Sequence, residues 1–170
     1  MAPTALASMG AGRSKSMRSC SRLARQFVEA SAVTRAAGTD ENRGMSVCPC
    51  GSGAEASLCC LRFLTGAALP ASPEQLMRSR YTAFARSDAE YLLSTWHPGS
   101  APAELPLDDG THWLGLEILD APPVADDAKR GIVEFVARYR EVSGELGHIH
   151  ERSRFVRQSG RWWYLDGVHT

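Results

Sequence analysis

Four cysteines gathered in one short segment carry the most evident chemistry of this sequence. They are Cys48, Cys50, Cys59 and Cys60, spaced C-x-C then C-C, and the chain's fifth cysteine is Cys20. Disulfides among them fit poorly, because a bridge within C-x-C or between adjacent cysteines closes a small strained ring. Bridges between the two pairs would close short loops and stabilise the chain little. Four thiolates form instead a tetrahedral ligand set for a metal such as zinc.

The ligand chemistry also limits the role of that metal. Sulfur ligands accept iron as well as zinc, so iron stays open as the alternative. Four protein ligands leave no position for water, which indicates a structural or recruiting role rather than catalysis. Gly51 and Gly53 follow the first cysteine pair, where they allow sharp turns whose N–H groups can point at sulfur. We expect Cys20 to be a free thiol.

Six further residues are candidates for a pocket or a partner surface: Arg78, Arg80, Tyr81, Trp96, Glu151 and Ser153. Period-two alternation places Glu151 and Ser153 on one strand face among apolar residues. A buried carboxylate needs a partner, and Arg78 or Arg80 is the natural one in a structural network. The alternative is a pocket in which desolvation raises the pKa of Glu151 and makes it a general base.

Capping signals predict the helix that carries the two arginines. Ser72 can cap it, Pro73 suits its first position, and Gln75 completes a capping box. Apolar residues then recur at helical spacing. The expected buried stripe is Met77, Tyr81 and Phe84.

A second helix is predicted directly after the first. Ser87 and Glu90 repeat the S-x-x-E signature, so we expect the helix to start at Ser87. It would carry Tyr91, Leu92 and Trp96. His97-Pro98 would end it, because the residue before proline disfavours helix.

Beyond a polar loop at 98–110, the apolar period changes from helical to two. The predicted strands are Trp113–Leu119, Ile132–Val142, His148–Arg157 and Arg161–Asp166, with a tight turn at Ser159-Gly160. In the second strand, period-two alternation places one set of residues on the same face: Val133, Phe135, Ala137 and Tyr139. Helices followed by an antiparallel meander predict α+β architecture, with helices packed on a curved sheet.

The chain divides into three predicted parts. Residues 1–44 carry seven basic and three acidic side chains and are rich in Ala, Ser and Gly, which predicts a disordered extension. That extension is either irrelevant, with Met45 as the true start, or a transit peptide. Residues 45–66 hold the cysteines, and residues 67–170 form the main domain.

Charge and hydropathy exclude some classes of protein. The net charge is +0, and residues 45–170 are mildly acidic, so bulk electrostatic binding of nucleic acid is not expected. No apolar run approaches the ~20 residues that cross a bilayer. We therefore expect a cytoplasmic protein without membrane insertion.

The motif C-P-C-G-S-G, followed five residues later by C-C, resembles the SEC-C motif, the metal-binding tail of the SecA translocation ATPase. P-E-Q-L-M-R-S-R-Y-T-A-F-A (73–85), H-E-R-S-R-F (150–155) and G-R-W-W-Y-L-D-G (160–167) resemble the bacterial YchJ family of uncharacterised proteins. The resemblance covers about residues 46–167. It implies a SEC-C zinc knuckle joined to a cystatin-like or nuclear-transport-factor-2-like cone.

One departure from the motif bears on function. SEC-C motifs usually carry Lys and an aromatic residue at the positions of Ala54 and Ala56. If those side chains touch a partner, the contact is weakened in this chain.

Two functions follow as hypotheses. The first is a non-enzymatic metal-binding protein whose knuckle recruits it to a protein or ribosomal partner, as the SEC-C resemblance implies. The second is a small enzyme or ligand-binding domain that uses the cone cavity around Glu151 and Arg80. The sequence leaves enzymatic activity open and leans against it. A homodimer through the sheet is a further expectation.

Overall fold

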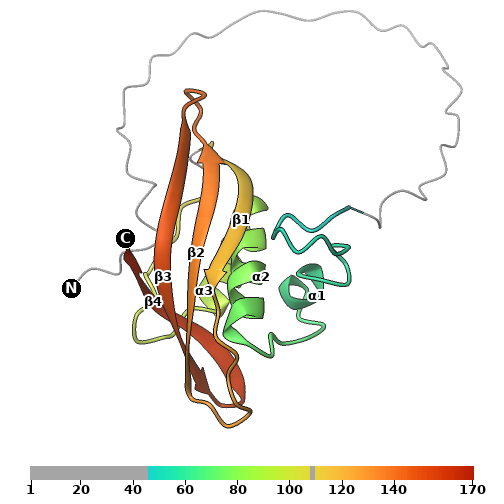
Figure 1. Ribbon diagram of the computed structural model, residues 1–170, viewed down its shortest axis with the longest axis vertical. Coiled ribbons are helices and arrows are strands. Elements are labelled where there is room, and N and C mark those ends of the chain that lie inside the picture. The colour runs from blue at the N-terminus through green and yellow to red at the C-terminus, as the bar shows by residue number, and fades with distance from the viewer. Residues whose placement is uncertain (1–45, 108–109) are drawn as a thin grey trace, which may run out of the picture.

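The computed structural model describes residues 46–107 and 110–170, and the predicted extension at 1–44 lies outside them. Its elements in chain order are α1 (Leu61–Leu64), α2 (Pro73–Ala85), α3 (Ala89–Ser94), β1 (His112–Asp120), β2 (Arg130–Arg140), β3 (Leu146–Gln158) and β4 (Arg161–His169). Figure 1 shows the sheet as one layer, α2 against it, and the cysteine segment with α1 on the far side of α2. Helices first and strands after them confirm the α+β prediction.

Helix α2 begins as its capping signals predict. The Ser72 hydroxyl accepts a hydrogen bond from the Gln75 amide at 3.2 Å, and Pro73 occupies the first turn. The Gln75 side chain accepts from the amide of Ala71 at 2.9 Å, one residue before the cap. These contacts satisfy amides that have no partner inside the helix.

No helix in the described part of the chain is long and apolar enough to span a bilayer.

The predicted start of the second helix is wrong: α3 begins at Ala89, and its cap is Asp88 instead of Ser87. Asp88 caps α3, because its carboxylate accepts from the Tyr91 amide at 2.9 Å. Ser87 has a φ of 55°, and its amide donates to the carbonyl of Phe84, so it ends the preceding helix. Asp caps a helix as well as Ser does, and two adjacent candidates cannot be separated by their spacing to one acid.

The predicted end of that helix is also wrong. Helix α3 stops at Ser94, so Trp96 lies outside it. Trp96 instead forms a parallel bridge with Tyr164, and the flanking amides of His97 and Tyr164 donate across it. The segment after α3 therefore pairs with β4, one of the two edge strands, and this pairing replaces another helical turn.

The four strands pair antiparallel in the order β1-β2-β3-β4. All four predicted strands are present with shifted ends, and Val142 lies beyond β2 in an exposed hairpin. Ser159 and Gly160, with φ of 52° and 79°, form the predicted turn between paired Gln158 and Arg161. Two consecutive positive φ angles suit a two-residue hairpin, because their twist matches that of the strands.

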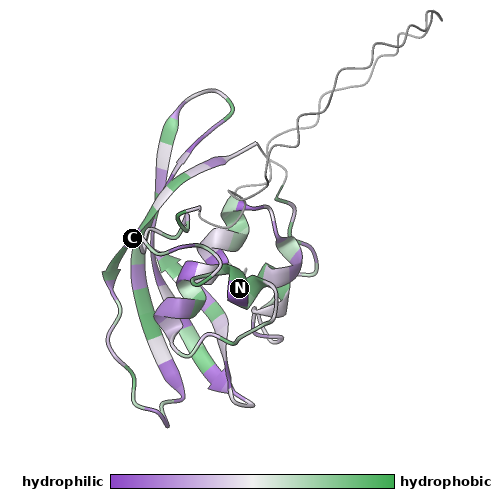
Figure 2. Ribbon diagram, turned by 90° about the vertical axis from the view of Figure 1, so that its right-hand side faces the viewer, coloured by the Kyte–Doolittle hydropathy of each residue, from purple (hydrophilic) through white to green (hydrophobic). Residues whose placement is uncertain are grey.

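One face of the sheet packs on the helices. The predicted inward residues of β2 are all buried: Val133, Phe135, Ala137 and Tyr139. Figure 2 shows hydrophobic and hydrophilic residues alternating along strands that curve around the helices. The buried cysteines belong to the same hydrophobic cluster as α2 and the sheet. The core is therefore continuous from the sheet to the cysteine segment.

Candidate metal centre

A small hairpin positions the first cysteine pair. Val47 and Glu55 form an antiparallel bridge, and the Cys48 amide donates to the carbonyl of Ala54 at 2.8 Å. The turn runs through Gly51 and Gly53, whose φ angles of 76° and 74° are those that glycine adopts freely. These glycines confirm the sharp turn that the motif predicts.

A second turn brings the other pair to the hairpin. The Ala56 carbonyl accepts from the amides of Cys59 and Leu61 at 3.2 and 2.9 Å. Cys60 then stands at the N-cap of α1, where its carbonyl accepts from the amide of Phe63. The two adjacent cysteines are thus held by a turn and by the start of a short helix.

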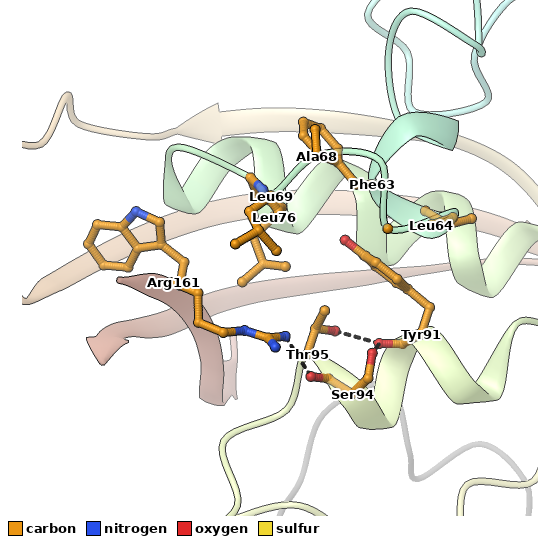
Figure 3. Close-up of a pocket in the computed structure, with 12 residues that line it drawn as sticks. Phe63, Leu64, Ala68, Leu69, Leu76, Tyr91, Ser94, Thr95 and Arg161 are labelled. Atoms are coloured by element: carbon orange, nitrogen blue, oxygen red, sulfur yellow. Dashed lines mark hydrogen bonds between the residues drawn. The ribbon is translucent and has the colours of Figure 1, made fainter. Parts of the chain in front are cut away.

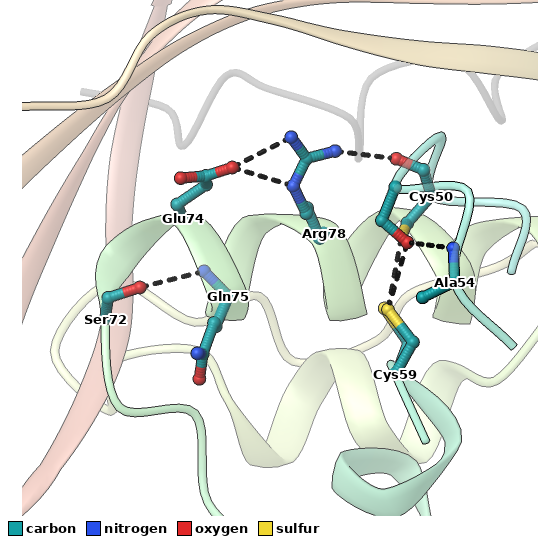
Figure 4. Close-up of polar contacts among 9 residues, drawn as sticks. Cys50, Ala54, Cys59, Ser72, Glu74, Gln75 and Arg78 are labelled. Atoms are coloured by element: carbon teal, nitrogen blue, oxygen red, sulfur yellow. Dashed lines mark hydrogen bonds and ion pairs between the residues drawn. The ribbon is translucent and has the colours of Figure 1, made fainter. Parts of the chain in front are cut away.

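The four sulfur atoms lie as close together as ligands of one metal ion must. The Sγ atoms of Cys50 and Cys59 are 3.6 Å apart (Figure 4), those of Cys59 and Cys60 are 3.7 Å apart, and all four Sγ atoms lie within 4.8 Å of one another. A tetrahedron with metal–sulfur bonds of ~2.3 Å has sulfur–sulfur edges of about 3.8 Å. A disulfide needs ~2.05 Å, and all four cysteines are free thiols. The spacing fits a tetrahedral metal.

Hydrogen bonds among these thiols shift their pKa values in opposite directions. Cys48, Cys50 and Cys60 are at most 2% exposed, and Cys59 is half-buried. Hydrogen bonding, first from Cys60 and then from Ser52, lowers the pKa of Cys50 to about 4 against the effect of burial. The same contact with Cys50, together with burial, raises the pKa of Cys60, and burial raises that of Cys59. The thiolate of Cys50 is thus stabilised, while Cys59 and Cys60 are kept protonated. Four thiolates in this space need a cation to balance their negative charge.

Ser52 is a contributor that the sequence reasoning missed. Its hydroxyl lies 3.3 Å from the Sγ of Cys59, and both its hydroxyl and its backbone amide lower the pKa of Cys50 after the larger effect of Cys60. The Gly51 amide donates to the carbonyl of Cys48 at 3.4 Å instead of to sulfur. The expected N–H contact to sulfur therefore comes from the residue between the glycines.

Helix α2 contacts the cysteine segment through two side chains. Arg78 donates from Nη1 to the carbonyl of Cys50 at 2.9 Å, and its other nitrogens pair with Glu74 at 2.8 Å (Figure 4). The hydroxyl of Thr82, which is fully buried, lies 3.7 Å from the Sγ of Cys48. No local pattern indicates Thr82, because the contact joins residues far apart in the chain.

Five of the six candidate pocket residues are buried, and Arg78 is half-buried. Arg80 is 1% exposed and donates to the Leu92 carbonyl at 2.7 Å and to the Thr95 hydroxyl at 2.8 Å. Its guanidinium lies over the rings of Trp96 and Tyr164, at 4.9 and 4.4 Å from their centroids. Burial lowers the pKa of Arg80 to about 10, so it stays charged at neutral pH.

Glu151 obtains its partners from the sheet. Ser153 donates to its Oε1 at 2.6 Å and Tyr164 to the same atom at 3.2 Å, while His169 lies 3.6 Å from Oε2. Among the described residues it forms no ion pair with Arg80, whose charge acts on it from farther away. The predicted ion pair with Arg78 or Arg80 is therefore wrong, because hydroxyl groups nearer in the sheet take that place. Burial raises the pKa of Glu151.

Apart from Arg78, the candidate pocket residues are enclosed. Tyr81 stands edge-on to Trp113 and is 1% exposed, and Glu151 and Ser153 are fully buried. The side chains on which the enzyme hypothesis rests are therefore closed to solvent in this structure. An open pocket of about 190 Å³ lies elsewhere, between the segment after α1, α3 and the start of β4 (Figure 3). There Arg161 donates to the Ser94 carbonyl at 2.8 Å.

Comparison with known proteins decides the family. The sequence model of the YchJ middle NTF2-like domain matches residues 72–167, which run from the cap of α2 into β4. The chain belongs to the YchJ family. Its nuclear-transport-factor-2-like domain and its cysteine cluster correspond to the two parts that the resemblance implies.

Bacterial relatives and solved structures agree. The YchJ-family chain is 47% identical to a UPF0225 protein of Enterobacter sp. (strain 638), over 72% of this chain and 82% of that protein. It is 50% identical to a UPF0225 protein of Streptomyces coelicolor, over 71% of this chain and 93% of that protein. The solution structure of a SEC-C motif containing protein from Rhodopseudomonas palustris is 35% identical, with a TM-score of 0.66 over 74% of this chain and 99% of that one. The crystal structure of a SEC-C motif containing protein from Psychrobacter arcticus is 27% identical, with a TM-score of 0.60 over 75% of this chain and 84% of that one.

Proposed function

We propose that this protein is a non-enzymatic metal-binding protein that holds one zinc ion on Cys48, Cys50, Cys59 and Cys60. The observation that carries the proposal is the convergence of four Sγ atoms within 4.8 Å of one another. Zinc suits the set because it accepts four thiolates at tetrahedral angles without redox chemistry. Iron is the alternative ion, because the same ligands accept it.

The bound ion would act on folding and on charge. It would join the hairpin that carries Cys48 and Cys50 to the turn that carries Cys59 and Cys60, segments otherwise linked by short hydrogen-bonded turns. Its positive charge would stabilise buried thiolates that are otherwise held protonated. With four protein ligands it would activate no water, which supports a structural and recruiting role.

The recruiting role belongs to the surface of the cysteine segment. Val47 and Leu58 are 68% and 71% exposed, and both adjoin Glu55, Val47 through the hairpin bridge and Leu58 through its amide. Ala56 is buried, so a side chain at this position cannot touch a partner in this chain. Ala54, the other position at which SEC-C motifs usually carry a larger side chain, is exposed. We therefore place the contact with a protein or ribosomal partner at Val47 and Leu58.

Metal binding is tested on the reduced, full-length protein. Native mass spectrometry and elemental analysis should find one zinc or iron ion per chain, and zinc would support our assignment. Substituting Cys59→Ser should lower the occupancy, whereas Cys20→Ser should not. A wild-type protein that carries no metal and takes up neither ion when offered would overturn the proposal.

Recruitment is tested separately with purified 70S ribosomes. The zinc-loaded wild type should pellet with ribosomes through a sucrose cushion, and a Val47→Asp, Leu58→Asp double variant should not. Leu146→Asp is the matched control, because Leu146 is equally exposed at 68% but lies at the start of β3. Equal pelleting of wild type and double variant, or no pelleting of either, would refute the ribosome contact.

A further inference from the structure

The cysteine segment does not stand apart from the domain that follows it. A Cβ atom added to Gly51 would lie 2.7 Å from the backbone carbonyl oxygen of Leu116 in β1. Cys48, Cys50 and Cys60 are buried in the same cluster as Leu76 of α2. The sulfur atoms therefore lie against the domain, and residues of the domain can act on them.

Arg78 is the first such residue. Its guanidinium is fixed on one side by Glu74, one helical turn earlier, and donates on the other side to the carbonyl of Cys50 (Figure 4). The planar guanidinium offers donors in a rigid fork, so it can make both contacts at once. A hydrogen bond to the backbone of a cysteine orients that cysteine without occupying its sulfur.

Thr82 is the second, one turn further along the same helix. Its hydroxyl lies 3.1 Å from the carbonyl of Arg78 and 3.7 Å from the Sγ of Cys48, and it interacts also with Cys60. A hydroxyl has one proton to donate. In the structure this hydroxyl donates to the carbonyl of Arg78, and the Sγ of Cys48 lies within its reach as a second acceptor.

We infer that Arg78 and Thr82 are positioning residues of the metal site, supplied by α2 from outside the cysteine segment. This inference rests on the proposed metal binding. Arg78 holds the backbone of Cys50, and Thr82 donates to the buried thiolate of Cys48. Partners that orient or hydrogen-bond metal ligands typically change metal affinity 10–100-fold (roughly) when removed. The retention of metal therefore depends on the helix as well as on the four cysteines.

The test is zinc affinity, measured by chelator competition on full-length variants. Thr82→Val keeps the shape of the side chain and removes the hydroxyl, and it should weaken zinc binding about 10-fold. Thr82→Ser keeps the hydroxyl and should bind zinc like the wild type. Arg78→Gln should weaken binding by a similar factor, and Arg78→Lys should restore only part of it, because an ammonium lacks the fork.

Arg86→Gln is the matched control, since Arg86 lies at the C-cap of the same helix. The spectrum of the cobalt(II)-loaded protein adds a readout that a loss of fold stability does not move, because thiolate-to-metal charge-transfer bands report the ligands themselves. They should shift in Thr82→Val and not in Arg86→Gln. If the wild type binds zinc and Thr82→Val and Arg78→Gln bind it equally well, this inference fails while the proposed function stands. If the wild type binds no metal, the proposed function itself fails.

Discussion

Replacing Gly51 by alanine should destabilise the protein far more than the same change at Gly53. Both residues have φ near +75°, and alanine in that region costs about 1–2 kcal/mol. At Gly53 the added Cβ meets nothing within 4 Å, whereas at Gly51 it lies 2.7 Å from the Leu116 carbonyl oxygen. Overpacking against a backbone that cannot rotate away adds about 1–3 kcal/mol.

The free energy of unfolding should therefore fall by about 1–2 kcal/mol in Gly53→Ala and by about 2–5 kcal/mol in Gly51→Ala. Urea unfolding followed by far-UV circular dichroism, at a fixed free zinc concentration, measures both. The loss of chain freedom in the unfolded state is the same for the two changes, so it cancels in the comparison. Equal losses for the two variants would refute the packing of the hairpin on β1.

Three further outcomes are expected. Burial raises the pKa of Glu151 above its ordinary 4.5, so the stability of the folded state falls as the pH rises from about 4.5 through the folded-state pKa. Urea titrations at a series of pH values should show that this fall is lost in Glu151→Gln, and a pH profile equal to that of the wild type would contradict the prediction. Asp88→Ala removes the cap of α3 and should cost about 1 kcal/mol, while Ser87→Ala should cost less, and the reverse order would refute the corrected helix start. Stripping the metal with a chelator should lower the melting temperature of the sheet, as followed by the near-UV circular dichroism of the aromatic side chains packed between α2 and the sheet. A melting temperature that the chelator leaves unchanged would show that the sheet and the cysteine segment are independent.

Local signals in the sequence predicted most of the fold. Ser72 and Pro73 are enough to predict the start of α2, and the alternation along β2 predicted its buried face. The choice between Ser87 and Asp88 failed because both are good caps. The position of Trp96 failed because its bridge to Tyr164 joins segments far apart in the chain, and no local pattern contains that pairing.

The candidate site divides in the same way. The cysteine spacing alone predicted a shared ligand set, because so short a segment must bring its sulfur atoms together. Thr82 could not be found, since a threonine within a helix has no feature that indicates a sulfur at its side. The partners of Glu151 were half predictable: Ser153 shares its strand face, but Tyr164 comes from the register between β3 and β4.

The unequal enclosure of the four sulfurs has a chemical consequence. Three of them are sealed by the hairpin, α2 and the sheet, while Cys59 stands partly open beside Ser52. Alkylating agents, oxidants and competing chelators all approach from water, so each meets Cys59 before the others. Loss of a bound ion would start at this one thiol, and the three enclosed ones would follow.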